Sequence, residues 1–284
     1  GSTYYPVALF VPSLPAPSDG YPVLLFLHGS GERGNDGEAQ TRSGLGPYLG
    51  AHGEEFPAIT VFPQAPADSD WSGDQSAAAL AAIELVEQEF PVDADHIYLT
   101  GMSRGGYGVW EVALRAPERF AALVPVCAGV IPPPGRDDLR VHALPANAAD
   151  PYASLAQTLP KTPVWLFHGA LDDIIPPQAS RDTFAALQAA GHPVHYTEFA
   201  DANHNAWDAA YGSPALWSWL FFAWHRGAWA LADVLLLVAL IAVAIVLFRR
   251  VRPLAAWLLL PYLAWVAFAS ALTWAVWRAN PGVL

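Results

Sequence analysis

The segment Gly101-Met102-Ser103-Arg104-Gly105 limits the fold of this chain more than any other. It follows an apolar run at 96–100 that is typical of a strand, and it precedes a helical pattern at 107–114. A strand, a G-x-S-x-G turn and a helix together lift one serine hydroxyl above a sheet. Glycines flank the serine because a Cβ atom there would collide with the neighbouring strand or helix. The pattern predicts that Ser103 is a covalent nucleophile and that the chain is a hydrolase.

The surrounding sequence predicts a parallel sheet covered by helices on both faces, because continuous apolar strands alternate with helical patterns. Ligands bind such sheets at the carboxyl ends of the strands. The further expected strands lie at 22–28, 58–62, 123–127, 164–167 and 194–199, and the further expected helices at 76–90 and 180–190.

A serine hydroxyl needs a base to take its proton, and the base is usually a histidine held by a carboxylate. In this topology the acid and then the histidine follow the serine along the chain. Asp172 and Asp173 follow the strand at 164–167, and either could orient an imidazole or simply cap a turn. His204 lies in the polar loop after the last expected strand, which makes it the candidate base in preference to a surface histidine.

The negative charge that develops on an attacked carbonyl needs backbone N–H donors. One donor is expected from Arg104, which follows the nucleophile, and the other from the glycine-rich loop at 28–34. We expect His28 in that loop to be structural. The single cysteine, Cys127, excludes an intramolecular disulfide and is expected to be a buried core residue.

The charge of the chain is uneven. Residues 1–215 carry 25 acidic and 9 basic side chains, whereas residues 216–284 carry 1 and 5, for a net charge of −12. An acidic body argues against nucleic-acid binding, because phosphate recognition needs basic patches.

A proline-rich connection at 129–162 interrupts the alternation of strands and helices. Long connections in compact domains are often functional. The stretch is either a partial lid or acyl-pocket wall, or a solvated excursion.

The C-terminal tail differs in kind from the rest. Two apolar runs, at about 229–248 and 254–277, are each long enough to cross a bilayer, and three arginines lie in the link between them. Eight of the twelve tryptophans lie from Trp217 onward, as at membrane interfaces. The runs predict a two-helix transmembrane hairpin at 226–284, with soluble buried helices as the alternative. The arginine-rich link predicts a cytoplasmic turn and therefore an extracytoplasmic (periplasmic or extracellular) hydrolase domain.

Residues 1–225 resemble the α/β-hydrolase superfamily. They are most similar to phospholipase/carboxylesterase-like and peptidase-like bacterial proteins related to feruloyl and acetyl-xylan esterases. The similarity rests on five ordered motifs: Phe26–Gly34, Pro63–Pro66 with Trp71, Gly101–Gly108, His168–Pro176 and His204–Tyr211.

The resemblance implies a role for each matching residue. Ser103 would be the nucleophile, Asp172 the acid and His204 the base. The backbone N–H groups of Ser30 and Arg104 would be the oxyanion donors. The residues expected to line the substrate cleft are Gln64, Trp71 and Trp207.

The tail resembles another family, the tryptophan-rich sensory protein/translocator protein membrane family. The similar segments are 215–226, 230–235 and 261–280, and Thr273 stands where that family commonly has asparagine. They correspond to the last helices of a five-helix protein, so the porphyrin- and sterol-binding function of that family is not carried over.

The sequence therefore predicts a membrane-anchored serine esterase with an α/β-hydrolase domain at 1–225 and a membrane hairpin at 226–284. Its substrates would be small-molecule esters with short-chain or aromatic acyl groups, its partner a lipid bilayer, and it would need no metal or cofactor. Two alternatives remain: a serine peptidase of the same fold, and a membrane ligand-binding or sensory protein with an inactive hydrolase domain.

Overall fold

The computed structural model describes residues 5–223, 227–251 and 253–279. The chain divides into two compact units, Gly1–Ser213 and Pro214–Leu284. The division falls about twelve residues before the domain boundary that the sequence predicts after residue 225.

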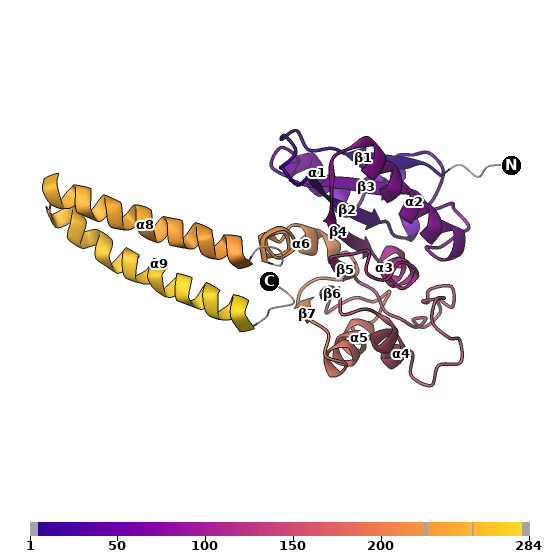
Figure 1. The fold of residues 1–284 in the computed structure, drawn as a ribbon. Helices are drawn as coiled ribbons and strands as arrows, with labels where there is room; N and C mark the ends of the chain where they lie inside the picture. The colour runs from indigo at the N-terminus through magenta and orange to yellow at the C-terminus, as the bar shows by residue number, and fades with distance from the viewer. Residues whose placement is uncertain (1–4, 224–226, 252, 280–284) are drawn as a thin grey trace. The chain divides into compact units, whose positions relative to one another are not determined.

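The first unit is built on a seven-stranded sheet with the strand order β1-β3-β2-β4-β5-β6-β7 (Figure 1). All neighbouring strands are parallel except β1, which runs antiparallel to β3 at one edge. The strands are β1 (Val7–Phe10), β2 (Tyr21–Leu27), β3 (Ile59–Pro63), β4 (Val92–Met102), β5 (Ala122–Val126), β6 (Val164–Gly169) and β7 (Val194–Phe199).

Helices cover both faces of this sheet, which confirms the predicted α/β-hydrolase architecture. Alternate residues of β2 separate the faces: Val23 and Leu25 join the core cluster beneath the helices α2, α3, α4 and α5, whereas the Phe26 ring contacts Tyr211 of α6 on the other face. The helices of this unit are α1 (Leu45–His52), α2 (Gly73–Glu89), α3 (Arg104–Arg115), α4 (Pro151–Thr158), α5 (Gln178–Ala189) and α6 (Trp207–Tyr211).

The expected strands and helices are all present, and β1, α1, α4 and α6 are among the further elements that were not predicted. The strand β1 is apolar, but it has only four residues and is half exposed, so it is a weak signal for a strand. The helix α1 contains Gly46, Pro47 and Gly50, which are weak helix formers. The helix α4 lies inside the proline-rich connection, where Pro151 takes the first helical position and the Asp150 carboxylate caps it by accepting from the N–H groups of Tyr152 and Ala153.

The rest of the proline-rich connection is fastened to α3. The Tyr107 hydroxyl donates to the Ile131 carbonyl at 3.1 Å. The buried Glu111 carboxylate accepts from the N–H groups of His142 and Ala143. Burial raises the pKa of Glu111 to about 7, although the two amide bonds act in the opposite direction. The proline-rich connection is therefore anchored to α3 rather than solvated along its whole length.

The second unit contains α7 (Pro214–Ser218), a π-helical segment η3 (Trp219–Ala223), α8 (Gly227–Val251) and α9 (Pro253–Ala279). The helices α8 and α9 pack against each other (Figure 1). Across the described residues, no helix combines the length and the apolar character that crossing a bilayer requires.

The close packing of α3 on β2 gives a first prediction. A Cβ atom on Gly105 would lie 1.9 Å from the Leu27 carbonyl oxygen, whereas a Cβ atom on Gly50 of α1 meets nothing within 4 Å. We expect Gly105→Ala to lower the free energy of unfolding by about 3 kcal/mol or more. The control Gly50→Ala should raise it by about 0.5 kcal/mol, because alanine favours helix. Urea denaturation measures both, and equal stabilities would contradict the packing.

The buried Glu111 gives a second prediction, on stability against pH. Because its pKa is higher in the folded chain than the ordinary value of 4.5, the unfolded chain loses the proton first as the pH rises. Stability that is present below pH 4.5 should therefore be lost as the pH passes about 7. Between pH 4.5 and 8, the free energy of unfolding of the wild type should fall by up to about 3 kcal/mol relative to that of Glu111→Gln. Denaturant titrations measure this, with the exposed Glu84→Gln as the control for one lost charge. If the wild type and Glu111→Gln differed in free energy of unfolding by the same amount at every pH, the prediction would be wrong.

Candidate active site

Ser103 occupies the sharp turn between β4 and α3, as the sequence predicts. Its backbone has φ 53° and ψ −120°, a conformation that L-residues rarely adopt and that the surrounding packing must impose. The Ser103 N–H donates to the Val126 carbonyl at 2.9 Å, which ties the turn to β5. The loop after β2 lies against it, since a Cβ atom on Gly29 would be 3.6 Å from the Ser103 Cβ.

The structure brings Ser103, His204 and Asp172 into one hydrogen-bonded chain. The His204 Nε2 lies 2.9 Å from the Ser103 Oγ, and the His204 Nδ1 lies 2.7 Å from the Asp172 Oδ2. The three residues follow the carboxyl ends of β4, β7 and β6, respectively. With the Nδ1 proton held by the carboxylate, the Nε2 lone pair faces the serine hydroxyl, which is the arrangement that a general base requires.

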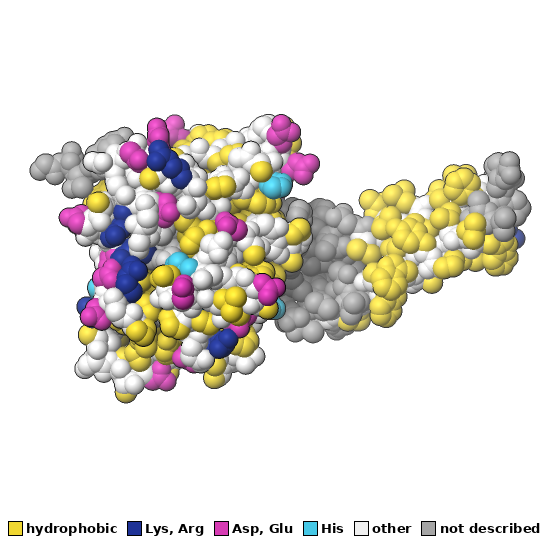
Figure 2. Space-filling model, turned by 180° about the vertical axis from the view of Figure 1, so that it is seen from behind, with side chains coloured by type: hydrophobic (Ala, Val, Ile, Leu, Met, Phe, Trp, Pro, Cys, Tyr) yellow, Lys and Arg dark blue, Asp and Glu magenta, His cyan; other side chains and the backbone are white. Residues whose placement is uncertain are grey.

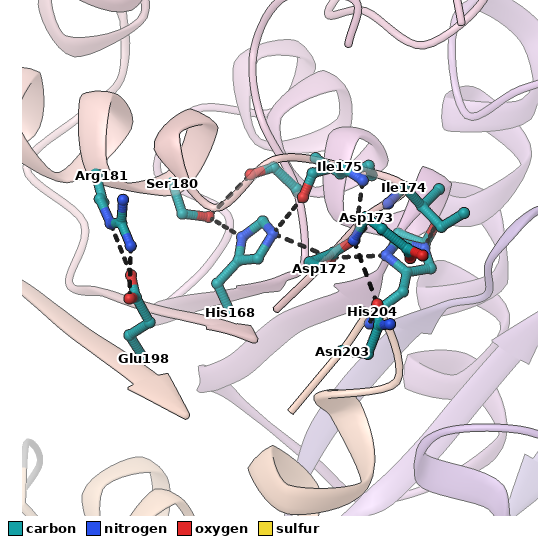
Figure 3. A network of polar contacts seen from close by, with 12 residues as sticks. His168, Asp172, Asp173, Ile174, Ile175, Ser180, Arg181, Glu198, Asn203 and His204 are labelled. Atoms are coloured by element: carbon teal, nitrogen blue, oxygen red, sulfur yellow. Dashed lines mark hydrogen bonds and ion pairs between the residues drawn. The ribbon is translucent and has the colours of Figure 1, made fainter. Parts of the chain in front are cut away.

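Asp172, and not Asp173, holds the imidazole (Figure 3). The Asp172 Oδ1 accepts from the N–H groups of Ile174 and Ile175, both at 2.9 Å, and its Oδ2 contacts both His204 and His168. Burial raises the pKa of Asp172, but the hydrogen bonds from His168, His204 and the Ile175 amide outweigh it and hold that pKa well below its ordinary value. The carboxylate is therefore ionised at neutral pH.

His168 is a contact of the acid that the sequence did not assign a role. Its imidazole is buried, with Nε2 lying 3.1 Å from the Asp172 Oδ2 and 2.9 Å from the Ile175 carbonyl oxygen. Its Nδ1 lies 2.7 Å from the Ser180 hydroxyl, which donates to the Ala128 carbonyl (Figure 3). His168 thus supports Asp172 from the side away from His204, and its place directly after a predicted strand and four residues before the acid was the available signal.

The two expected oxyanion donors stand at the starts of two helices. Ser30 begins the short 3-10 helix η1 (Ser30–Glu32), and Arg104 begins α3. The first N–H groups of a helix have no acceptor within the helix. Along the part of the chain that the structure describes, neither the Ser30 N–H nor the Arg104 N–H donates to a backbone carbonyl.

Two of the expected cleft residues have supporting positions instead. Gln64 is buried, and its amide bonds the Asp36 carboxylate at 2.9 Å, the Glu32 carbonyl and the Gly37 N–H, so it fastens the loop after η1. Trp71 is buried, and its indole N–H donates to the His28 carbonyl at 3.0 Å. Hydrogen bonding and packing hold both side chains inside the domain.

Trp207, by contrast, lies beside the base. Its ring meets the His204 ring edge to face, with centroids 5.3 Å apart, and it is only half-buried. Its indole therefore borders the space next to the nucleophile.

His28 has the structural role expected of it. Its Nδ1 donates to the Gly29 carbonyl at 2.7 Å, and its Nε2 accepts from the Ala65 N–H at 3.0 Å. Burial lowers the pKa of His28 to about 4, so the ring is neutral at physiological pH.

One group of potential metal ligands lies behind the site. Within the described ranges, Cys127, His168 and Asp172 place ligand atoms within 4.8 Å of one another. Burial and the Asp172 charge raise the pKa of the Cys127 thiol, which keeps it protonated. A thiol binds metals as the thiolate, and the Asp172 oxygens already accept four hydrogen bonds, so this group is poorly suited to a metal.

Two family models match parts of the chain. Residues 143–224 match the prolyl oligopeptidase family, and residues 199–278 match the TspO/MBR family.

Individual proteins show the same two similarities. The translocator protein of Sus scrofa is 48% identical over 68 residues, which is 23% of this chain and 40% of that protein. NocK of Nocardia uniformis subsp. tsuyamanensis, which is named as an esterase, is 32% identical over 130 residues, 43% of this chain and 37% of that protein. The chain thus spans less than half the length of these curated relatives.

A solved thermostable esterase superposes with a TM-score of 0.60 and 28% identity, over 76% of this chain and 58% of that one. The chain therefore carries an esterase- and peptidase-like α/β-hydrolase fold, followed by a segment that matches the TspO/MBR family.

Proposed function

We propose that the first unit is a serine hydrolase acting on carboxylic esters. The observation that carries this proposal is the hydrogen-bonded chain from the Ser103 Oγ through His204 to Asp172, placed at a strained turn. Similarity to the thermostable esterase and to NocK supports ester substrates.

In the proposed reaction the Ser103 Oγ attacks the ester carbonyl while the His204 Nε2 takes the hydroxyl proton. The resulting oxyanion accepts from the N–H groups of Ser30 and Arg104. His204 then gives its proton to the departing alcohol oxygen, which leaves an acyl group on Ser103. A water molecule, deprotonated by His204, attacks that acyl group, and the carboxylic acid leaves as the serine regains its proton.

The ionised Asp172 stabilises the imidazolium that forms in both steps and fixes its orientation. Because the Asp172 carboxylate accepts four hydrogen bonds before any substrate binds, the base is already oriented in the free enzyme. We propose short-chain or aromatic acyl groups as substrates, since the half-buried Trp207 ring offers a flat apolar surface beside His204.

A serine peptidase is the second candidate, because the prolyl oligopeptidase match covers both Asp172 and His204. The chemistry is the same, but the leaving group is an amine, which must be protonated before it departs. Rates on matched ester and peptide substrates separate the two functions.

The proposed function gives a third prediction. Ser103→Ala should abolish hydrolysis of p-nitrophenyl acetate and methyl ferulate, on the order of a 10⁵-fold loss in kcat, because the nucleophile is gone. The fold should be retained, as circular dichroism would show. The matched control is Ser13→Ala, an exposed serine in the connection between β1 and β2. Turnover of a peptide p-nitroanilide in place of the esters would favour the peptidase, and activity remaining in Ser103→Ala would remove Ser103 from its role.

We propose further that the second unit binds a lipid bilayer. The similarity to the TspO/MBR family supports this, and so does the exposed apolar surface of α8 and α9, since soluble proteins rarely expose contiguous apolar patches of this kind. Among the exposed side chains are Leu236, Leu240, Trp257, Leu258, Trp265 and Phe268. Figure 2 shows how hydrophobic side chains predominate on this unit, whereas charged ones are scattered over the other.

A fourth prediction follows for membrane binding. The full chain should float with phosphatidylcholine vesicles, and the compact unit 1–213 should remain in the soluble fraction. Labelling of Ser103 by a fluorophosphonate reports that both proteins are folded. Leu240→Lys with Leu258→Lys in the full chain should weaken flotation, because each lysine charge must leave water. A full chain that stays soluble in the presence of vesicles would overturn the proposal.

A further inference from the structure

The Arg104 side chain links the nucleophile turn to the loop after β2. Its guanidinium is buried, with only 4% of the side chain exposed, and a buried charge is costly unless it is hydrogen-bonded. The Arg104 Nε donates to the Ser30 hydroxyl at 2.9 Å, and the Arg104 Nη2 pairs with the Asp138 carboxylate. One side chain thus joins α3, η1 and the proline-rich connection.

Ser30 is held at a second point by another arginine. The Arg33 Nε donates to the Ser30 carbonyl at 3.1 Å, and the Arg33 Nη1 donates to the Ser69 carbonyl at 3.0 Å. The hydroxyl and the carbonyl of Ser30 are therefore both fixed by guanidinium groups. Its N–H, at the first position of η1, takes part in neither of these bonds.

Sheet pairing alone does not set the distance between the two oxyanion donors. The last paired residues of β2 and β4 are Leu27 and Gly101, so the ladder ends three residues before Ser30 and three before Arg104. Beyond that point, the Arg104–Ser30 hydrogen bond is the direct link between the two residues whose N–H groups form the proposed hole.

We propose that the Arg104 side chain is a positioning residue, which holds the Ser30 N–H at the distance from the Arg104 N–H that an oxyanion requires. This inference rests on the proposed serine-hydrolase function. It assigns Arg104 two roles, one through its backbone and one through its guanidinium. It also couples the proline-rich connection to the reaction, because Asp138 partners the same guanidinium.

The expected effect lies on the chemical step. Removing a whole oxyanion donor costs about 10²- to 10³-fold in kcat, so displacing one donor should cost less, about 10-fold. Ground-state binding of the ester does not use the hole fully, so KM should change less than about twofold.

The test uses the full chain with Arg104→Gln, Ser30→Ala and the double variant. Ser30→Ala keeps the backbone N–H and removes only the hydroxyl that Arg104 holds. The rate is measured on p-nitrophenyl acetate and divided by the concentration of competent sites, which a fluorophosphonate titration of Ser103 supplies. Misfolded protein therefore lowers the titre and not the rate per site.

Each single variant should lose about 10-fold in kcat. The double variant should lose no more than either, because both substitutions break the same Arg104–Ser30 hydrogen bond. Affinity for a boronic acid, which mimics the tetrahedral intermediate, should fall by the same factor. Arg104→Lys should recover only part of the rate, since one ammonium cannot serve two partners in the guanidinium geometry. Arg136→Gln removes a more exposed partner of Asp138 and is the control, expected to keep the full rate.

Three results would overturn the inference: an unchanged kcat in Ser30→Ala, additive losses in the double variant, or an effect confined to KM. If the unaltered chain hydrolyses no ester and takes up no fluorophosphonate at Ser103, the proposed function itself fails. That outcome is distinct from an active chain whose Arg104 and Ser30 variants keep full activity.

Discussion

The contact between the start of α3 and the end of β2 is the constraint on which the site depends. At Gly105 the two backbones are too close for any side chain, and Ser103, two residues earlier, has a strained conformation. The loop of Gly29 and Ser30 lies against Ser103. A strained residue persists only where its surroundings over-determine it, and here the packing of helix on strand does so.

Two buried charges complete the arrangement, and each has hydrogen-bond partners. Asp172 accepts four hydrogen bonds, two from amides of its own turn and two from imidazoles. Arg104 donates to Ser30 and pairs with Asp138. Because these bonds are part of the folded chain, the proposed reaction would find the groups already oriented.

Much of this fold could be predicted from the sequence. Most of the parallel strands have continuous apolar runs, and β2 through β7 were all expected. The G-x-S-x-G motif located Ser103, and the order of serine, acid and histidine along the chain located His204. Asp172 and Asp173 could not be separated by spacing, because both follow β6, and only the family resemblance favoured Asp172. The half-exposed β1 and the glycine-containing α1 lack the periodicity on which such predictions depend.

Side-chain direction was the part that the sequence could not supply. Gln64 and Trp71 were expected at the cleft because the family resemblance implied it, yet both are buried and hydrogen-bond to loops. His168 and Arg104 show the reverse, since residues with no assigned side-chain role contact the acid and the Ser30 loop. These hydrogen bonds join segments that are far apart in the chain, so short sequence patterns cannot predict them. In this domain, sequence motifs therefore identify the candidate catalytic residues. The residues that position them can be identified only from the fold.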